Sequence, residues 1–198
     1  MEKIHTKLFE LASPYLDTRG NREHTRIAYE FAARLLDEEE GDPCVVFPAI
    51  ILHDVGWKRI PEELQSSAYG PGSNDLALNR VHEVEGAKIA GQILLEVHYP
   101  LHFVREITEI ILGHDSRKQA ISASDAVVKD ADKLWRYTDH ALRAFAERFG
   151  MTTQQSIDRL TPVVDQWFLT ASGRRMAAEQ LLRHESDWGI CQGNKKAG

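Results

Sequence analysis

This sequence of 198 residues has only two cysteines, no long apolar run and no excess of positive charge. The two cysteines, Cys44 and Cys191, lie far apart in the sequence and form no disulfide framework, so a reducing compartment is expected. No window approaches the roughly 18 apolar residues of a membrane-spanning helix, and the N-terminus lacks the apolar core of a signal peptide. We therefore expect a cytoplasmic protein without a membrane partner.

The charge balance limits the possible partners further. A net charge of −6 and an isoelectric point near 5.8 exclude a general attraction to nucleic acids or anionic membranes. A nucleic-acid polymer is therefore not expected as a partner, and a small anionic substrate would need local help from a metal ion or a few basic groups. The hydrophobic fraction of 42% and the charged fraction of 27% are typical of a globular protein that buries a core.

Strand signals are lacking as well, because apolar residues recur at helical spacing and no persuasive run alternates apolar and polar residues. The pattern predicts an all-α protein. Helices are expected over about residues 2–12, 22–40, 43–56, 82–97, 101–113 and 122–149, with one or two more between 153 and 188. The first should stop before Pro14, and Asn21 should cap the second. The stretch 57–80 should be irregular, with at most one short helix and a surface loop over SSAYGPGSND.

The chain is short enough for one main domain with a helical extension. Residues 1–150 are predicted to form the main helical domain, and residues 151–198 a C-terminal helical extension packed on it. No internal repeat or low-complexity linker separates the two parts. The C-terminal helices are candidates for a homodimer interface.

Titratable residues lie on the apolar faces of five expected helices. Each face carries one such group, and the five are His24, His53, His82, His114 and Asp132. A lone histidine on an apolar stripe is more often a hydrogen-bonded core residue than a metal ligand. Burying several such groups is costly unless each has a partner, and a divalent cation is a partner for several imidazoles and carboxylates at once. Helical bundles build metal sites from ligands on facing helices in this way.

The order of these residues resembles the H…HD…D signature of the HD-domain superfamily of metal-dependent phosphohydrolases. Here the signature consists of His24, the dipeptide His53-Asp54 in AIILHDVGW and an aspartate of VKDADKL. The similarity covers roughly residues 20–140 and includes REHTRIAYEFAARLL, HEVEGAKIAGQIL and ITEIILGHD. It implies an HD-domain-like helical bundle that holds metal between its helices, in this chain with extra C-terminal helices.

By this resemblance the primary metal ligands are His24, His53, Asp54 and Asp132. Asp130 is the alternative to Asp132, because residues two apart on a helix point about 200° away from each other and only one can face the metal. The family motif favours Asp132, which leaves Asp130 to support the site or to lie at the surface. His82 and His114 match the extra histidines of two-metal members, in which Asp54 would bridge the ions. A one-ion site, with both histidines hydrogen-bonding substrate or each other, is the alternative.

The resemblance implies a phosphohydrolase that cleaves a phosphate ester, such as a nucleotide, a phosphomonoester or a phosphodiester, by a metal-activated water. The cofactor would be one or two divalent ions, drawn from Mn, Fe, Mg, Co, Ni and Zn. Such ions lower the pKa of bound water, and a pair can hold the attacking and leaving oxygens. The substrate would be a small anionic compound that contains phosphate, because the transition state spreads negative charge over phosphoryl oxygens.

Two lysines near the ligands are candidates for substrate contacts. Lys133 directly follows Asp132 and resembles a phosphate-contacting lysine of the nucleotide-cleaving branch of the superfamily. Lys58 follows the HD dipeptide, where some relatives have a phosphate-contacting lysine, but Trp57 shifts its position by one residue. We predict catalytic roles for Asp54, Lys58 and Lys133, and a solvated surface charge is the alternative for both lysines.

Two other functions stay open. The first is that of an oxygenase, because one branch of the superfamily uses the same six ligands to hold two irons and cleaves carbon–carbon or carbon–phosphorus bonds with O₂. The other is a non-catalytic ligand sensor or scaffold whose metal is structural. The sequence has no synthetase domain and no Gly-Tyr-Pro motif, which argues against alarmone and cyclic-dinucleotide substrates.

Overall fold

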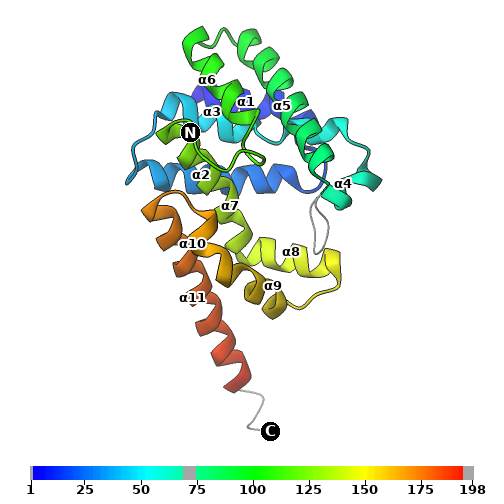
Figure 1. Ribbon diagram of the computed structural model, residues 1–198, viewed down its shortest axis with the longest axis vertical. Helices are drawn as coiled ribbons and strands as arrows, with labels where there is room; N and C mark the ends of the chain where they lie inside the picture. The colour runs from blue at the N-terminus through cyan, green and yellow to red at the C-terminus, as the bar shows by residue number, and fades with distance from the viewer. Residues whose placement is uncertain (1, 69–74, 194–198) are drawn as a thin grey trace.

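The computed structural model describes residues 2–68 and 75–193, with side chains described as far as residue 184. Figure 1 shows helices throughout, and no strand occurs in the described ranges. The prediction of an all-α protein is confirmed. The surface loop predicted over SSAYGPGSND lies largely outside the described residues.

The helices follow one another with short connections. The N-terminal group is α1 (Lys3–Leu16), α2 (Asn21–Leu36), α3 (Pro43–Leu52), the 3₁₀ helix η1 (Val55–Arg59) and α4 (Glu62–Ala68). The middle group is α5 (Leu76–Glu96), α6 (Leu101–Ile111), α7 (Ala123–Leu134) and the 3₁₀ helix η2 (Trp135–Tyr137). The C-terminal group is α8 (Asp139–Phe149), α9 (Thr153–Leu160), η3 (Thr161–Val163), α10 (Val164–Trp167) and α11 (Ala171–Gly193).

Helix α3 is the central element of the core. Its sequence PCVVFPAIIL is apolar on almost every side, as expected of a helix that is surrounded by others. It packs against α1, α2, α6 and α7, and the side chains from Ala49 to Leu52 are fully buried. The HD dipeptide at the end of this helix is therefore held inside the bundle.

Several helix boundaries differ from the predicted ones. Helix α1 continues through Pro14, which lies exposed in its last turn and leaves one carbonyl of the preceding turn without its helical donor. Asn21 is the first residue of α2 and not its cap, because Gly20 precedes it in a left-handed conformation with φ 79°. Helix α5 begins at Leu76, six residues earlier than predicted, because the Asp75 side chain accepts hydrogen bonds from the first backbone N–H groups.

The single helix predicted over residues 122–149 is wrong, because the chain breaks it into α7, η2 and α8. At the break, Thr138 is extended with ψ 153°, and its hydroxyl accepts a hydrogen bond from the backbone N–H of Ala141. A new helix begins there, and it ends on Gly150, which has a φ of 62°. The break brings the end of α8 to a pocket that is also lined by α4.

The C-terminal helices pack beneath α7 (Figure 1), and α11 contacts both α7 and η2. Asp130 of α7 makes the main polar link, because its carboxylate accepts hydrogen bonds from the backbone N–H groups of Leu169 and Thr170. Helix α11 begins at Ala171 and continues through Gly173.

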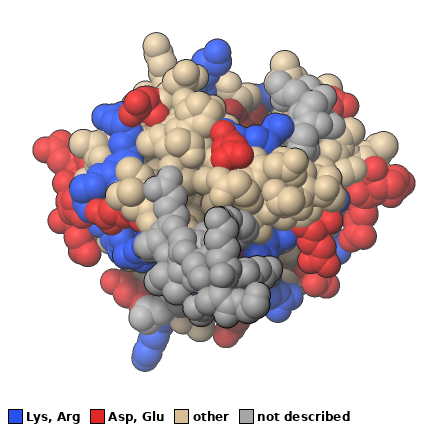
Figure 2. Space-filling model, turned by 90° about the horizontal axis from the view of Figure 1, so that it is seen from below, with Lys and Arg blue, Asp and Glu red and all other residues tan. Residues whose placement is uncertain are grey.

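The surface is mixed in charge, as the composition predicts. The face seen from the C-terminal end has acidic side chains at both sides and uncharged residues across much of its middle (Figure 2). Across the described ranges, no helix combines the length and apolar character needed to cross a membrane.

Candidate metal centre

The six predicted metal ligands come together from separate parts of the bundle. They come from five places in the fold: His24 from α2, His53 and Asp54 from the end of α3, His82 from α5, His114 from beyond α6 and Asp132 from α7. All six are buried, and the most exposed, Asp54, has an exposed fraction of only 7%. Groups of this kind need partners in the interior, since an unpaired buried charge is costly.

The first cluster consists of His24, His53, Asp54 and Asp132. The Nε2 atoms of the two histidines lie 2.9 Å apart. Nε2 of His24 lies 3.5 Å from Oδ2 of Asp54 and 3.3 Å from Oδ1 of Asp132, and Nε2 of His53 lies 3.7 and 3.6 Å from the same oxygens. Donors that bind one ion at about 2.1 Å lie about 3.0–3.4 Å from each other in octahedral or tetrahedral geometry. These atoms therefore enclose a space the size of one ion.

The second cluster consists of His82, His114 and Asp115. The Nε2 atoms of His82 and His114 lie 3.2 Å apart. Oδ2 of Asp115 lies 3.5 Å from Nε2 of His82 and 4.0 Å from Nε2 of His114. Oδ1 of Asp54 lies 3.7 Å from Nε2 of His114, while its Oδ2 faces the first cluster. The two carboxylate oxygens of Asp54 therefore face different clusters.

Asp115 is the donor that the sequence-based ligand set missed. It directly follows His114, so residues 114–115 repeat the His-Asp dipeptide of residues 53–54. That repetition, on a second apolar helix end, is the signal that could have identified it. The structure gives the second cluster a carboxylate of its own beside the shared Asp54.

The histidine tautomers suit metal binding. Nδ1 of His53 lies 2.8 Å from the carbonyl oxygen of Ile50, and Nδ1 of His114 lies 2.8 Å from that of Ile111. A ring nitrogen beside a carbonyl must carry the proton and donate, which leaves Nε2 facing the cluster. Metal-bound histidines are commonly held by this kind of hydrogen bond to a backbone carbonyl. The nitrogen and oxygen donors together fit a borderline divalent metal.

Charges within the centre compensate one another. Burial alone would raise the pKa of Asp54, but His53, His114, His24 and Arg19 hold it well below its usual range. Burial lowers the pKa of His114, yet the carboxylates of Asp54 and Asp115 outweigh burial and raise it to about 9. Both pKa shifts have the same cause, because imidazoles and carboxylates face one another within the centre.

His82 and Asp132 show opposite effects of the same burial. Burial and the neighbouring His114 lower the pKa of His82 to about 4, so this imidazole is neutral at pH 7 and free to act as a ligand. Burial would raise the pKa of Asp132, but Arg136, His24 and His53 hold it well below its usual range. A neutral imidazole and an ionised carboxylate are the protonation states that metal binding requires.

Trp57 is a neighbour of the centre that the sequence did not single out. Its indole Nε1 donates a hydrogen bond of 3.0 Å to Oδ1 of Asp54. Its ring stacks on His82 with centroids 4.2 Å apart and an interplanar angle of 16°, and the Arg19 guanidinium lies 3.8 Å from the ring centroid. Trp57 therefore orients both the Asp54 carboxylate and the His82 ring of the second cluster.

Substitution of Trp57 by Phe should weaken the second metal site. The ring is kept, but the hydrogen bond to Asp54 is lost, and losses of this kind cost roughly ten- to a hundredfold in metal affinity. Isothermal titration with Mn²⁺ should give weaker binding of one ion and unchanged binding of the other. Trp167→Phe is the matched control, because Trp167 also lines the cleft but makes no contact with Asp54 in the described interactions. Equal affinities in wild type and Trp57→Phe would contradict the assigned role.

The turn that carries His114 and Asp115 is held by two buried side chains of opposite charge. Glu83 Oε1 accepts hydrogen bonds from the backbone N–H groups of Asp115 and Ser116, at 3.0 and 2.8 Å. Lys129 Nζ donates to the carbonyl oxygens of Gly113 and His114, at 2.6 and 2.7 Å. The two side chains satisfy four backbone groups in the interior and fix the position of the turn.

Substitution of Lys129 by Met should lower the free energy of unfolding by about 2–4 kcal/mol, because two buried carbonyls lose their donor. Urea unfolding followed by circular dichroism measures the change. Lys88→Met provides the control, since Lys88 is exposed on α5 and pairs only with Glu85 in the described interactions. A Lys129 variant as stable as the control would show that the turn does not depend on this lysine.

The other predicted residues are distributed differently. Lys58 is exposed and donates a 3.0 Å hydrogen bond to the carbonyl of Asp17, and it does not line the metal cleft. Lys133 does line the cleft and donates 2.9 Å to the carbonyl of Trp167. Asp130 is buried but turns toward the segment before α11, so Asp132 is the aspartate of this pair that reaches the cluster.

A cleft of about 1530 Å³ opens onto the metal centre. Its metal-centre walls include His24, Asp54, His114, Asp115 and Asp132. Basic side chains dominate its other charged positions: Arg19, Arg80, Arg117, Lys118, Lys133, Arg136, Arg148 and Arg159. Such a lining provides the local positive charge that an anionic ligand needs in a protein with a net negative charge.

Comparison with known proteins agrees with this geometry. The family model described as "HD domain" matches residues 21–137, more than half of the chain. A crystal structure of a predicted HD superfamily hydrolase from an uncultured Thermotogales bacterium is similar in fold, with a TM-score of 0.63. The two chains are 17% identical, and the superposition covers 98% of this chain and 92% of that one. Comparison with curated proteins finds no match. The expected HD-domain-like bundle is confirmed, and the chain belongs to the HD-domain family.

Proposed function

We propose that this protein is a metal-dependent phosphohydrolase that cleaves a phosphate ester of a small anionic compound. The observation that supports it most directly is the position of the Asp54 carboxylate between two clusters of nitrogen and oxygen donors. One of its oxygens faces each cluster. These clusters lie in a cleft whose remaining charged lining is mainly basic. A pair of donor clusters beneath positive side chains suits the chemistry of phosphate esters.

The ligands divide between two sites. His24, His53, Asp54 and Asp132 would hold one ion, and His82, His114 and Asp115 would hold a second that shares Asp54. Bound divalent ions supply Lewis acidity, which lowers the pKa of a water molecule and offsets negative charge on phosphoryl oxygens.

The chain itself contributes substrate binding and orientation. Arg136 lies 3.6 Å from Asp132 and lines the cleft, so its guanidinium is placed beside the first cluster. Lys133 lines the same cleft, and its ammonium is held by the carbonyl of Trp167. We assign both to contacts with the phosphate. We assign no substrate contact to Lys58, because it is exposed outside the cleft.

Metal analysis and turnover assays test the proposal together. The protein as purified should contain bound divalent metal, and 4-nitrophenyl phosphate, bis(4-nitrophenyl) phosphate or a member of a nucleotide panel should be hydrolysed. Chelation should abolish this activity, and at least one of Mn²⁺, Co²⁺, Ni²⁺, Mg²⁺ and Fe²⁺ should restore it. Lys58→Met should retain activity, whereas Lys133→Met should raise the KM for phosphate esters.

Two results would count against the proposal. Absence of hydrolysis with every metal and every ester would remove its basis. Consumption of O₂ by iron-loaded protein with an organic substrate would indicate the oxygenase chemistry of the related branch instead.

A further inference from the structure

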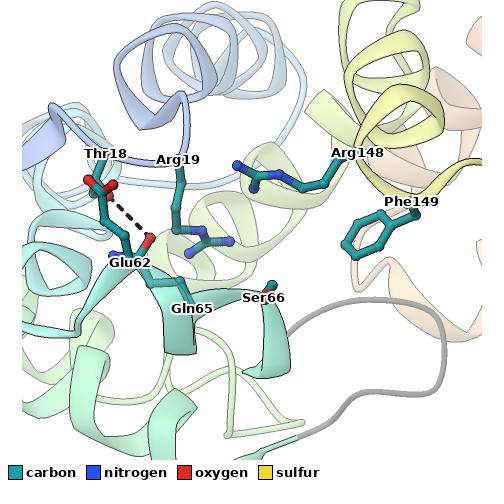
Figure 3. Close-up of a pocket in the computed structure, with 7 residues that line it drawn as sticks. All are labelled: Thr18, Arg19, Glu62, Gln65, Ser66, Arg148 and Phe149. Carbon is teal, nitrogen blue, oxygen red and sulfur yellow. Dashed lines mark hydrogen bonds between the residues drawn. The ribbon is translucent and has the colours of Figure 1, made fainter.

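A second pocket, of about 420 Å³, adjoins the metal cleft (Figure 3). Arg19, Arg148 and Phe149 line both cavities, so the two are direct neighbours. The rest of its lining is polar and consists of Thr18, Glu62, Gln65 and Ser66. A compound bound at the metal centre could therefore extend into this pocket.

The wall opposite the arginines is rigidly built. Gln65 is buried, and its amide donates hydrogen bonds to the carbonyls of Trp57 and Ile60, at 3.3 and 2.8 Å. Its Oε1 accepts a 3.1 Å hydrogen bond from the Thr18 hydroxyl. These bonds tie α4 to η1 and to the turn before α2, so the shape of the pocket is preorganised.

Two guanidinium groups define the chemistry of the pocket. In Figure 3, the side chain of Arg19 extends downward and that of Arg148 extends from the right, and both guanidinium groups end near the middle of the view. Among the described residues of the lining, Glu62 is the one carboxylate beside these two guanidinium groups. Guanidinium groups match the oxygens of phosphate with paired hydrogen bonds. Phosphate is therefore the ligand group that this lining favours.

Arg19 connects the pocket to the metal centre. It lies over Trp57, and Trp57 in turn stacks on His82 of the second cluster. Its backbone has a φ of 55°, a left-handed conformation that is uncommon for a residue other than glycine. Such strained positions are maintained where a side chain must be placed for a task.

The pocket is built in part from segments outside the family core. The turn with Thr18 and Arg19 precedes the matched residues 21–137, and the end of α8 with Arg148 and Phe149 follows them. The matched region supplies the metal ligands, and the flanking segments add positive charge beside them. This arrangement suits a pocket that contributes to selectivity among phosphate-containing substrates.

We propose that this pocket binds a second phosphate group, located on the part of the substrate that is released. The preferred substrates are then compounds with at least two phosphates, in which transfer of one phosphoryl group to water releases a part that still carries the other. Compounds with one phosphate use only the metal centre. The proposal rests on the proposed function, because it concerns the substrate of the same centre.

Steady-state kinetics with AMP and ADP test this. Hydrolysis of the terminal phosphate of ADP releases AMP, which carries a phosphate, whereas hydrolysis of AMP releases adenosine, which carries none. Arg148→Ala should lower kcat/KM for ADP by roughly tenfold or more beyond any effect on AMP, as expected for the loss of a charged hydrogen bond. Arg148→Lys should recover part of the loss. Arg143→Ala is the control, because Arg143 is exposed on the same helix and lines neither cavity. Equal effects of Arg148→Ala on the two compounds, or no effect on either, would overturn the proposal.

Equilibrium dialysis of ADP and AMP with the protein as purified separates this proposal from the proposed function. If no ester is hydrolysed, the proposed function fails, and dialysis alone decides on the pocket. Binding of ADP that is tighter than that of AMP and is weakened by Arg148→Ala, but not by Arg143→Ala, supports a second phosphate site. Binding of the two compounds with equal affinity, or insensitivity of ADP binding to Arg148→Ala, would contradict it.

Discussion

Substitution of Asp54 by Asn should abolish binding of the second ion, weaken binding of the first and lower phosphate-ester hydrolysis by roughly a thousandfold or more. A bound ion contributes several kcal/mol of transition-state stabilisation, and each 1.36 kcal/mol is about a factor of ten in rate. Asp54 matters most because its two oxygens face different clusters. Asparagine has one neutral oxygen and cannot serve both ions.

Metal content by mass spectrometry and hydrolysis of 4-nitrophenyl phosphate measure the effect of Asp54→Asn. Asp115→Asn is the informative comparison, since Asp115 contacts only the second cluster in the described interactions and its loss should spare the first ion. Asp37→Asn serves as the control, because Asp37 is exposed at the end of α2. Retention of two ions by the Asp54 variant would refute the bridging assignment.

Substitution of Gly56 by Ala should lower the free energy of unfolding by about 3 kcal/mol, at the upper end of the usual cost of overpacking. A Cβ atom at this position would lie 1.9 Å from the carbonyl oxygen of His82 and 2.5 Å from the backbone nitrogen of Gly86. Both are backbone atoms, so no side-chain rotation can relieve the clash. Helix α5 would have to move away from η1.

The same substitution should weaken the second metal site, because α5 carries His82. Gly91→Ala is a matched control on this helix, where the added Cβ would lie 3.6 Å from the side chain of Thr108, an ordinary contact. That variant should be as stable as wild type or more so by about 0.5–1 kcal/mol, since alanine favours a helix interior. Urea unfolding and Mn²⁺ titration measure both effects. A Gly56 variant as stable as Gly91→Ala would show that the backbone packing adapts.

The Asp54 and Gly56 variants separate the contribution of a donor atom from that of the backbone packing around the centre. Asp54→Asn removes a donor and leaves the bundle intact, whereas Gly56→Ala changes the distance between two elements and leaves every donor in place. If both reduce binding of the second ion, the centre depends on its ligands and also on the close packing of η1 against α5.

The sequence by itself determined the all-α class, and with the family resemblance it predicted the six residues that the fold gathers at the candidate metal centre. Helical periodicity is a local property, because side chains three or four residues apart share a face whatever the helix packs against. The apolar stripes around His24 and His53 therefore indicated burial without knowledge of the fold. The choice between Asp130 and Asp132 followed from the family motif, and the two side chains do lie in different surroundings.

Helix ends were less accessible from the sequence. Trp135 and Tyr137 continue the helical spacing of apolar residues past Leu134, so periodicity alone predicted one helix over residues 122–149. The break depends on the hydrogen bond from the Ala141 N–H to Thr138, which only a particular backbone geometry allows. Serine and threonine occur at many positions in a sequence, and one of them caps a helix only where the backbone leaves the helical conformation. Their presence alone therefore does not locate a helix boundary.

Only the tertiary structure decided which residues surround the ligands. Asp115 meets His82 in the second cluster, Trp57 stacks on His82, and Lys129 holds the turn after α6. These contacts join elements that are distant in the sequence. The exclusion of Lys58 from the cleft is of the same kind. A helix's own sequence specifies which face is buried, but the neighbour that it meets depends on how all the helices pack together, and that packing is a property of the whole chain.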